Sequence, residues 1–314
     1  MRIFLAGATG VIGVRIVPQL INKGHQVSAV ARTNAKRARL AELGATPVAV
    51  DLFDDAALRD ALAQHDAVIN MATSIPPSSR ALLPGAWRAN DRIRTVAAAN
   101  IADATIAVGA KRLIQESFAP IYPDCGDEWI DERTPVKPAR YNRSTLDAER
   151  AAERFTSSGG SGVVLRFALF YGHDSGFTLD ALRYVRKGWA AALGSPAGFI
   201  SSITHDDAAS AVLAALDVPG GVYNVVDDEP VRRREYFDLL AAGLGVDPPK
   251  FPPAWLSRIT GSIGETLARS QRISNAKLKS MSDWQPEAPS VREGWPRVLA
   301  QVSGRPQPAP VGAR

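Results

Sequence analysis

The chain has 314 residues, of which 46% are hydrophobic, with a formal net charge of +5 and a single cysteine, Cys125. This composition supplies a sizeable core and excludes a disordered polypeptide, and one cysteine excludes an internal disulfide or a cysteine metal cluster. Basic residues alternate with acidic ones, and no apolar stretch reaches about 18 residues. We therefore predict a cytoplasmic protein that binds neither nucleic acid nor membrane and holds no metal.

The first thirteen residues pass from an apolar segment into the glycines Gly7, Gly10 and Gly13. Residues 3–6 are typical of a buried strand, and residues 11–23 of an amphipathic helix. Gly7 permits a tight turn, Gly10 lets a pyrophosphate approach the backbone, and Gly13 lets the helix pack closely on the strand. A flexible loop is the alternative, but this strand–loop–helix context favours a dinucleotide site. The site would also include Thr9, Val11 and Ile12.

The second predicted strand, residues 26–31, is followed by Arg32 rather than by an acidic residue. An acid here would accept hydrogen bonds from the ribose of NAD, whereas a basic group can bind the 2′-phosphate of NADP. Lys36 and Arg37 add further positive charge. The pattern predicts NADP as the cofactor, with a solvated basic helix start as the alternative.

Strands alternate with helices through the next ninety residues. We predict strands at 46–50, 67–71 and 112–116, and helices at 54–63 and 85–108. Ligands of open α/β sheets bind where the strands end. The residues that follow these strands are therefore assigned to the ligand sites: Asp51 and Leu52 near adenine, Ala72 and Thr73 in a loop, and Ser117 after the fifth strand.

The second half of the chain continues the same alternation. Helices are predicted at 142–156 and 176–193, and strands at 163–167 and 222–226. Residues 303–314 are rich in Pro, Gly, Ala and Arg, which predicts a disordered tail. The alternation indicates an α/β fold with a doubly wound parallel sheet.

Several short runs, taken in order, resemble the extended and atypical short-chain dehydrogenase/reductase superfamily, which contains NAD(P)-dependent epimerases and dehydratases. The runs are the glycine segment 7–13, Asp51-Leu52, Asn70-Met71-Ala72-Thr73, Glu116-Ser117, Tyr141-Asn142-Arg143-Ser144, Leu165-Arg166-Phe167 and Tyr171-Gly172. The resemblance implies a Rossmann sheet of about seven strands and a smaller C-terminal substrate lobe. The Rossmann domain would comprise residues 1–170 and 200–227, and the lobe residues 171–199 and 228–302.

The family's catalytic signature is a serine after the fifth strand and a tyrosine followed four residues later by lysine. Ser117 and Tyr141 occupy the first two positions, but position 145 is threonine. A phenol with a pKa near 10 ionises poorly at neutral pH without a nearby cation. We predict that Tyr141 donates a proton while Ser117 binds the same oxygen, and that a lysine at 145 would ease ionisation of Tyr141. The alternative is that Tyr141 is a buried packing residue.

Family members that act on nucleotide sugars share an asparagine that grips the diphosphate, in an Arg-x-x-Asn-x-Tyr-Gly run. This chain has Arg166, but Leu169 stands at the asparagine position. The replacement argues against a nucleotide-sugar substrate. We assign Phe167 and Leu169 to the wall of the cofactor site beside an apolar substrate.

These observations predict an NADP-dependent oxidoreductase that reduces a carbonyl or related group on a small, largely apolar substrate. An NAD(P)-dependent epimerase or dehydratase, and an NADP-binding sensor without catalysis, are the alternatives. The protein would be a monomer or a homodimer, since helices 85–108 and 142–156 resemble those that form dimer contacts in the family.

Overall fold

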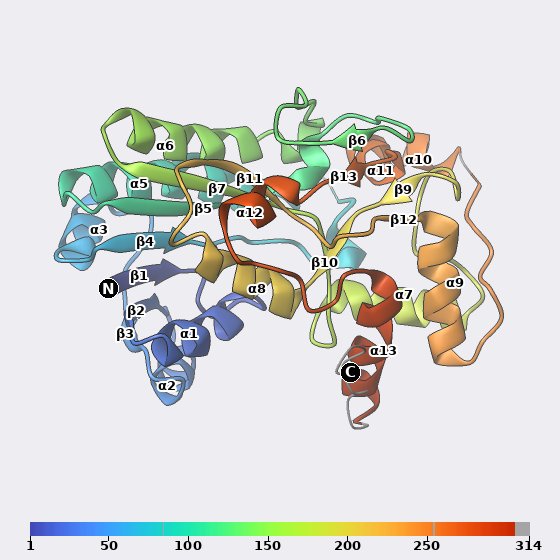
Figure 1. Cartoon of the computed structure of the whole chain (residues 1–314), viewed down its shortest axis with the longest axis horizontal. Helices are drawn as coiled ribbons and strands as arrows, with labels where there is room; N and C mark the ends of the chain where they lie inside the picture. The colour runs from blue at the N-terminus through green and yellow to red at the C-terminus, as the bar shows by residue number, and fades with distance from the viewer. Residues whose placement is uncertain (84, 254, 305–314) are drawn as a thin grey trace.

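The computed structural model describes residues 1–83, 85–253 and 255–304. Seven strands form one sheet in which every neighbouring pair is parallel, in the order β11-β7-β5-β4-β1-β2-β3 (Figure 1). The strands of this sheet are β1 Arg2–Ala6, β2 Gln26–Val30, β3 Thr46–Val48, β4 Ala67–Asn70, β5 Arg112–Phe118, β7 Ser161–Phe167 and β11 Gly221–Val225. The predicted Rossmann class and doubly wound parallel sheet are confirmed.

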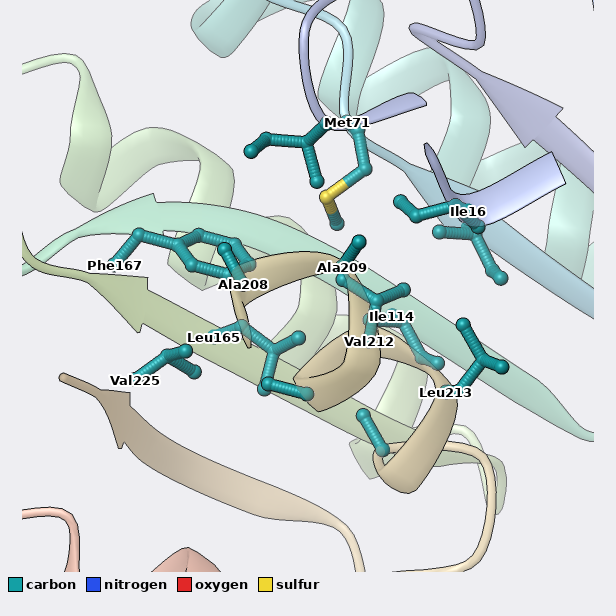
Figure 2. Packing of buried hydrophobic residues seen from close by; sticks show 14 of the residues in the cluster. Ile16, Met71, Ile114, Leu165, Phe167, Ala208, Ala209, Val212, Leu213 and Val225 are labelled. Carbon is teal, nitrogen blue, oxygen red and sulfur yellow. The ribbon is translucent and has the colours of Figure 1, made fainter. Parts of the chain in front are cut away.

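Helices cover both faces of the sheet (Figure 1). One face carries α1 Gly13–Asn22, α2 Asn34–Glu42 and α8 His205–Ala214, and the other carries α3 Asp55–Leu62, α5 Ala98–Ala107 and α6 Thr145–Ser157. Figure 2 shows Ala208 and Val212 of α8 lying over Ile114 and Leu165 of the sheet, all four fully buried. Apolar residues on both faces of the central strands explain why these strands are hydrophobic in almost every position.

The order of the strands reverses direction between β1 and β4. From β1 the chain builds outward through β2 and β3, and then returns to the other side of β1 for β4, β5, β7 and β11. Parallel strands end at a common edge, and ligands of such sheets bind in the crevice at this reversal. Gly7 follows β1 there, and Met71 follows β4.

A third hydrophobic cluster lies beyond the sheet, on the side of its carboxyl ends (Figure 1). It joins α7 Gly176–Arg186, α9 Arg233–Leu244 and α13 Val291–Ser303 around the aromatic rings of Tyr171, Tyr236 and Trp295. Three two-stranded sheets complete the strands: β8 Leu169–Tyr171 with β10 Ser202–Thr204, β9 Phe199–Ile200 with β12 Val231–Arg232, and β6 Trp129–Ile130 with β13 Arg272–Ile273. The remaining helices are α4 Arg88–Arg92, α10 Leu256–Ile259, α11 Gly261–Ala268 and α12 Ala276–Met281.

The predicted domain division remains a prediction, and the packing adds a detail to it. Ile273, Leu278 and Trp284, from the stretch assigned to the lobe, pack in the cluster that contains α1 and α8. Within the residues that the structure describes, no helix is long and apolar enough to cross a membrane.

Two predicted helices differ in detail from the structure. The helix expected at 85–108 runs as α4, a π-helical turn at Ile93–Ala97 and α5. The helix expected at 176–193 ends at Arg186, and Gly188 follows with a φ of 80°, a left-handed conformation that does not continue a helix.

The C-terminal region holds a helix that the sequence analysis did not predict. Helix α13 begins at a capping box in which Ser290 and Glu293 bond each other's backbone amides. This signal is visible in the sequence. Ser303, expected to open a disordered tail, is the last residue of α13, and Gly304 caps it; the rest of that prediction lies outside the described residues.

The glycine loop provides a test of this packing. A Cβ on Gly7 would lie 2.3 Å from the carbonyl carbon and oxygen of Met71, and the φ of Gly7 is 82°. We expect Gly7→Ala to lower the free energy of unfolding by about 3 kcal/mol, from overlap and backbone strain together. Gly24 has a φ of 79° with open space around it, so Gly24→Ala should lose only about 1 kcal/mol. Urea unfolding measures both, and equal losses would contradict the close contact.

Candidate functional site

The glycines of the loop between β1 and α1 allow close contacts within the protein and leave one part of the loop open to a ligand. A Cβ on Gly13 would lie 2.3 Å from the carbonyl oxygen of Gly7, so this position holds the start of α1 against the loop. Gly10 is exposed, and a Cβ there would meet only the Gly7 oxygen, at 3.3 Å. The surface above Gly10 is therefore open, with Thr9 half-buried and Val11 exposed beside it. This geometry fits a dinucleotide pyrophosphate bound at the N-terminus of α1.

The other predicted cofactor residues follow neighbouring strands along the same edge. Arg32 stands two residues after β2, and Asp51 and Leu52 follow β3. Ala72 and Thr73 follow β4 on the other side of β1. The sheet order thus brings these predicted residues into one row, although they are separated in the sequence by up to forty residues.

Arg32 is exposed at the start of α2. The hydroxyl of Thr33 caps this helix by accepting a hydrogen bond from the backbone nitrogen of Lys36 at 3.4 Å. Helix α2 carries no acidic residue in its first turn. Its positive N-terminus and the Arg32 guanidinium together form a surface suited to an anion.

Two predicted cofactor residues have their side chains in the core. Ile12 and Phe167 belong to the cluster beneath α8, and Phe167 lies beside Ala208 in Figure 2. Leu169, in β8, is half-buried. Of these three side chains, Leu169 is the most accessible to a ligand, and the assignment of all three to the cofactor remains a prediction.

Ser117 lies in a buried polar network. Its hydroxyl donates a hydrogen bond of 2.5 Å to Glu149 Oε1, and Arg166 donates two to the same carboxylate, at 2.8 and 2.7 Å. Arg166 also donates to the Tyr122 hydroxyl at 2.8 Å, which in turn donates to Asn224 at 2.9 Å. Because the proton of Ser117 is held by Glu149, its predicted bond to a substrate oxygen requires this contact to open.

Tyr141 occupies a different position. It lies in the short turn Arg140–Asn142 before α6, with its ring 4.9 Å from that of Trp87. Burial raises the pKa of Tyr141 to about 12, and the positive charge of Arg94 acts in the opposite direction. Thr266 of α11 and Arg269 flank the phenol. Tyr141 is therefore neutral at pH 7 and carries a proton that it can donate.

Thr145 stands where the family has its catalytic lysine, and a buried arginine from another segment lies beside it. Arg94, in the π-helical turn, donates to Thr145 Oγ1 at 2.8 Å and to Glu116 Oε1 at 2.7 Å. The two side chains of the ion pair are 4% and 11% exposed. No motif in the sequence indicates Arg94, because this residue lies 51 positions before its partner Thr145.

Several buried polar atoms without a hydrogen-bond partner in the described part of the chain lie in the segments that contain Arg94, Glu116 and Tyr141. Among the described residues, Asn90 Nδ2, Arg94 Nε, Glu116 Oε2 and both polar side-chain atoms of Asn142 have no hydrogen-bond partner. Buried polar atoms are normally satisfied. This group contains both donors and acceptors, as needed by a ligand with hydroxyl or amide groups.

A cavity of about 550 Å³ shares Arg269 with the surroundings of Tyr141, although Tyr141 does not line it. Its walls include Lys137, Arg258 and Arg269, together with the acidic residues Asp124 and Glu265. Cys125, nearby in the chain, has its pKa raised by burial and by adjacent acids, so it is not an activated thiol. Across the described residues, no group of three or more His, Cys, Asp or Glu side chains could hold a metal ion.

Residues 7–219 match the NAD(P)H-binding protein family. The chain is 33% identical over 306 residues to a 3-diazoavenalumate denitrifying reductase from Streptomyces sp., covering 94% of this chain and 99% of the relative. It is 27% identical over 281 residues to a 4-hydroxy-2-methyl-3-oxo-4-farnesyl-3,4-dihydroquinoline-1-oxide ketoreductase from Stigmatella aurantiaca, covering 86% and 81% of the two chains.

Among solved structures, UDP-glucose 4-epimerase from Thermus thermophilus in complex with NAD has a TM-score of 0.78 and 23% identity, covering 97% of this chain and 99% of that one. The chain belongs to the NAD(P)H-binding family, and its fold is that of the extended short-chain dehydrogenases/reductases. The protein is an NAD(P)-dependent oxidoreductase.

The Ser117 network predicts a large stability effect. Glu149→Ala would leave the guanidinium of Arg166 buried without its carboxylate, and we expect a loss of about 3 kcal/mol in the free energy of unfolding. The next residue, Arg150, is exposed and pairs with Asp147 at the surface, so Arg150→Ala should change stability by less than about 0.5 kcal/mol. Denaturant unfolding compares the two, and similar losses would show that the buried network contributes little.

Proposed function

We propose that this protein is an NADP-dependent reductase of a small substrate with an electron-poor unsaturated group such as a carbonyl. Two observations carry the proposal: Tyr141, half-buried before α6, is protonated, and the glycine loop is open at the reversal of the strand order. The related reductases support this direction of reaction.

The preference for NADP is inferred from Arg32. Its exposed guanidinium lies beside the N-terminus of α2, and no acidic residue follows β2 to compete for a ribose hydroxyl. Arg32 would hold a 2′-phosphate, while the backbone around Gly10 would hold the pyrophosphate.

The protein's part in the chemistry is to supply a proton. The bound cofactor supplies a hydride to the substrate carbon. Tyr141 donates its phenolic proton to the oxygen on which negative charge develops, and the resulting phenolate regains a proton from water. Tyr141 is protonated at neutral pH and can therefore act as the proton donor that reduction requires.

The substrate is inferred from the relatives and the site. Leu169 replaces the amide that would grip a nucleotide sugar, so the epimerase alternative has less support than reduction. The named substrates of the two related reductases are a diazo compound and a ketone of a quinoline oxide. The charged walls of the cavity that Arg269 lines favour a substrate that carries a polar group next to its apolar part.

The cofactor preference can be measured directly. We expect NADPH to bind about 10 to 100 times more tightly than NADH, which is the value of one or two charge-assisted hydrogen bonds. Arg32→Ala should narrow this gap, whereas Arg39→Ala, an exposed substitution in the last turn of α2, should leave it unchanged. Fluorescence titration with both nucleotides gives the ratio. Equal affinities in the unmodified protein would exclude the assignment.

The proton donor is tested with a panel of ketones and diazo compounds. Tyr141→Phe should lower the rate of NADPH-dependent reduction by about 100-fold, as expected for loss of a general acid. Its NADPH affinity should stay nearly unchanged, because the hydroxyl would touch the substrate. Turnover that survives the substitution would assign the proton to another group, and a panel with no NADPH consumption would contradict the proposed function.

A further inference from the structure

Arg94 is more deeply buried than most arginines in this protein. It is 3% exposed, and its two terminal nitrogens are bound to Thr145 and Glu116. Its Nε has no partner among the described residues, and neither has Glu116 Oε2. Leaving such an atom unsatisfied costs about 1–3 kcal/mol. A structural ion pair alone does not explain why this cost is retained.

The backbone places Arg94 inward at an irregular turn. The π-helical turn Ile93–Ala97 interrupts an otherwise α-helical run, and such turns are frequent at functional sites. Four exposed or half-buried neighbours surround Arg94 in the sequence, from Arg92 to Val96, while its own side chain is buried. The turn therefore directs one charged group into the interior.

Two positive charges act on Tyr141, from different elements. Arg94 comes from the π-helical turn, and Arg269 follows α11. Arg269 is engaged by Glu265 and by the backbone oxygens of Tyr122 and Lys137. The carboxylate bound to Arg94 is Glu116, which offsets part of its charge.

We propose that Arg94 is a positioning residue for proton donation, whose guanidinium, held beside Thr145, stabilises the phenolate left on Tyr141. The inference rests on the proposed role of Tyr141. Because Thr145 Oγ1 accepts the hydrogen bond from Arg94, its own hydrogen points away from the guanidinium. The guanidinium of Arg94, from the π-helical turn between α4 and α5, thus acts on residues at the start of α6.

The first experiment exchanges the position of the charge. Arg94→Met should lower turnover by at least about tenfold, equivalent to one pKa unit in the stability of the phenolate. Thr145→Lys alone should also lower turnover, in contrast to the gain expected from the sequence, because Arg94 already donates to Thr145 and the lysine would place a second cation against it. The double variant Arg94→Met/Thr145→Lys should be at least about tenfold faster than Arg94→Met. If Arg94 were only structural, Arg94→Met would keep the turnover of the unmodified protein once the folded fraction is taken into account.

The second experiment needs no turnover and uses the protein without nucleotide. NMR of protein labelled at the tyrosine ζ carbon follows ionisation of Tyr141, whose signal is assigned by its absence in Tyr141→Phe. Glu116→Gln keeps the hydrogen-bond geometry and removes the negative charge, so the signal should begin to move about one pH unit lower. In Arg94→Met, or in Arg94→Met/Glu116→Gln if the single variant does not fold, it should move at higher pH than in the unmodified protein.

A matched control is Arg154→Gln, which removes an arginine of α6 that pairs with exposed Asp103 at 3.2 Å. This substitution should change neither the titration of Tyr141 nor the rate of reduction. Tyr141 signals that are unmoved by Glu116→Gln and Arg94→Met would overturn the role of Arg94, even if the protein is a reductase. Shifted signals in a protein that reduces no substrate would support this role and contradict the proposed function.

Discussion

The crevice at the centre of this protein depends on the contact between Gly7 and the end of β4. A side chain at position 7 would overlap the carbonyl of Met71, so the two strand ends approach as closely as they do only because residue 7 is glycine. Gly13 repeats the requirement one turn later, against the Gly7 oxygen. Together these contacts hold the N-terminus of α1 at the reversal of the strand order, where its free amides can face an anion.

Two buried ion pairs build the other half of the site, and both attach to consecutive residues of β5. Glu116 binds Arg94 from the turn before α5, while Ser117 binds Glu149 of α6, which is held by Arg166 of β7. Buried charges are tolerated when they are paired and hydrogen-bonded. The two pairs therefore tie the π-helical turn, α6 and β7 to the end of β5.

Tyr141 lies between residues that are far apart in the sequence. Its ring contacts Trp87 on one side, and Thr266 and Arg269 flank it on the other. Removal from water raises the pKa of the phenol to about 12, so its proton is retained at neutral pH. On the proposed function, Tyr141 would supply the proton and the nearby cation Arg94 would stabilise the phenolate left behind. This division of roles would explain how the site can function with Thr145 in place of lysine.

Hydrophobic periodicity and glycine spacing are local properties of the chain, so the fold class and the parallel sheet could be predicted from the sequence. The row of cofactor residues and the catalytic roles of Ser117 and Tyr141 were also proposed from it, and they remain predictions. The hydrogen bond that Ser117 donates to Glu149 and the position of Arg94 beside Thr145 are visible only in the tertiary structure. Arg94 reaches that position through a π-helical turn and a contact across 51 residues. Contacts of this kind depend on how helices pack around a strand end, which no local pattern encodes.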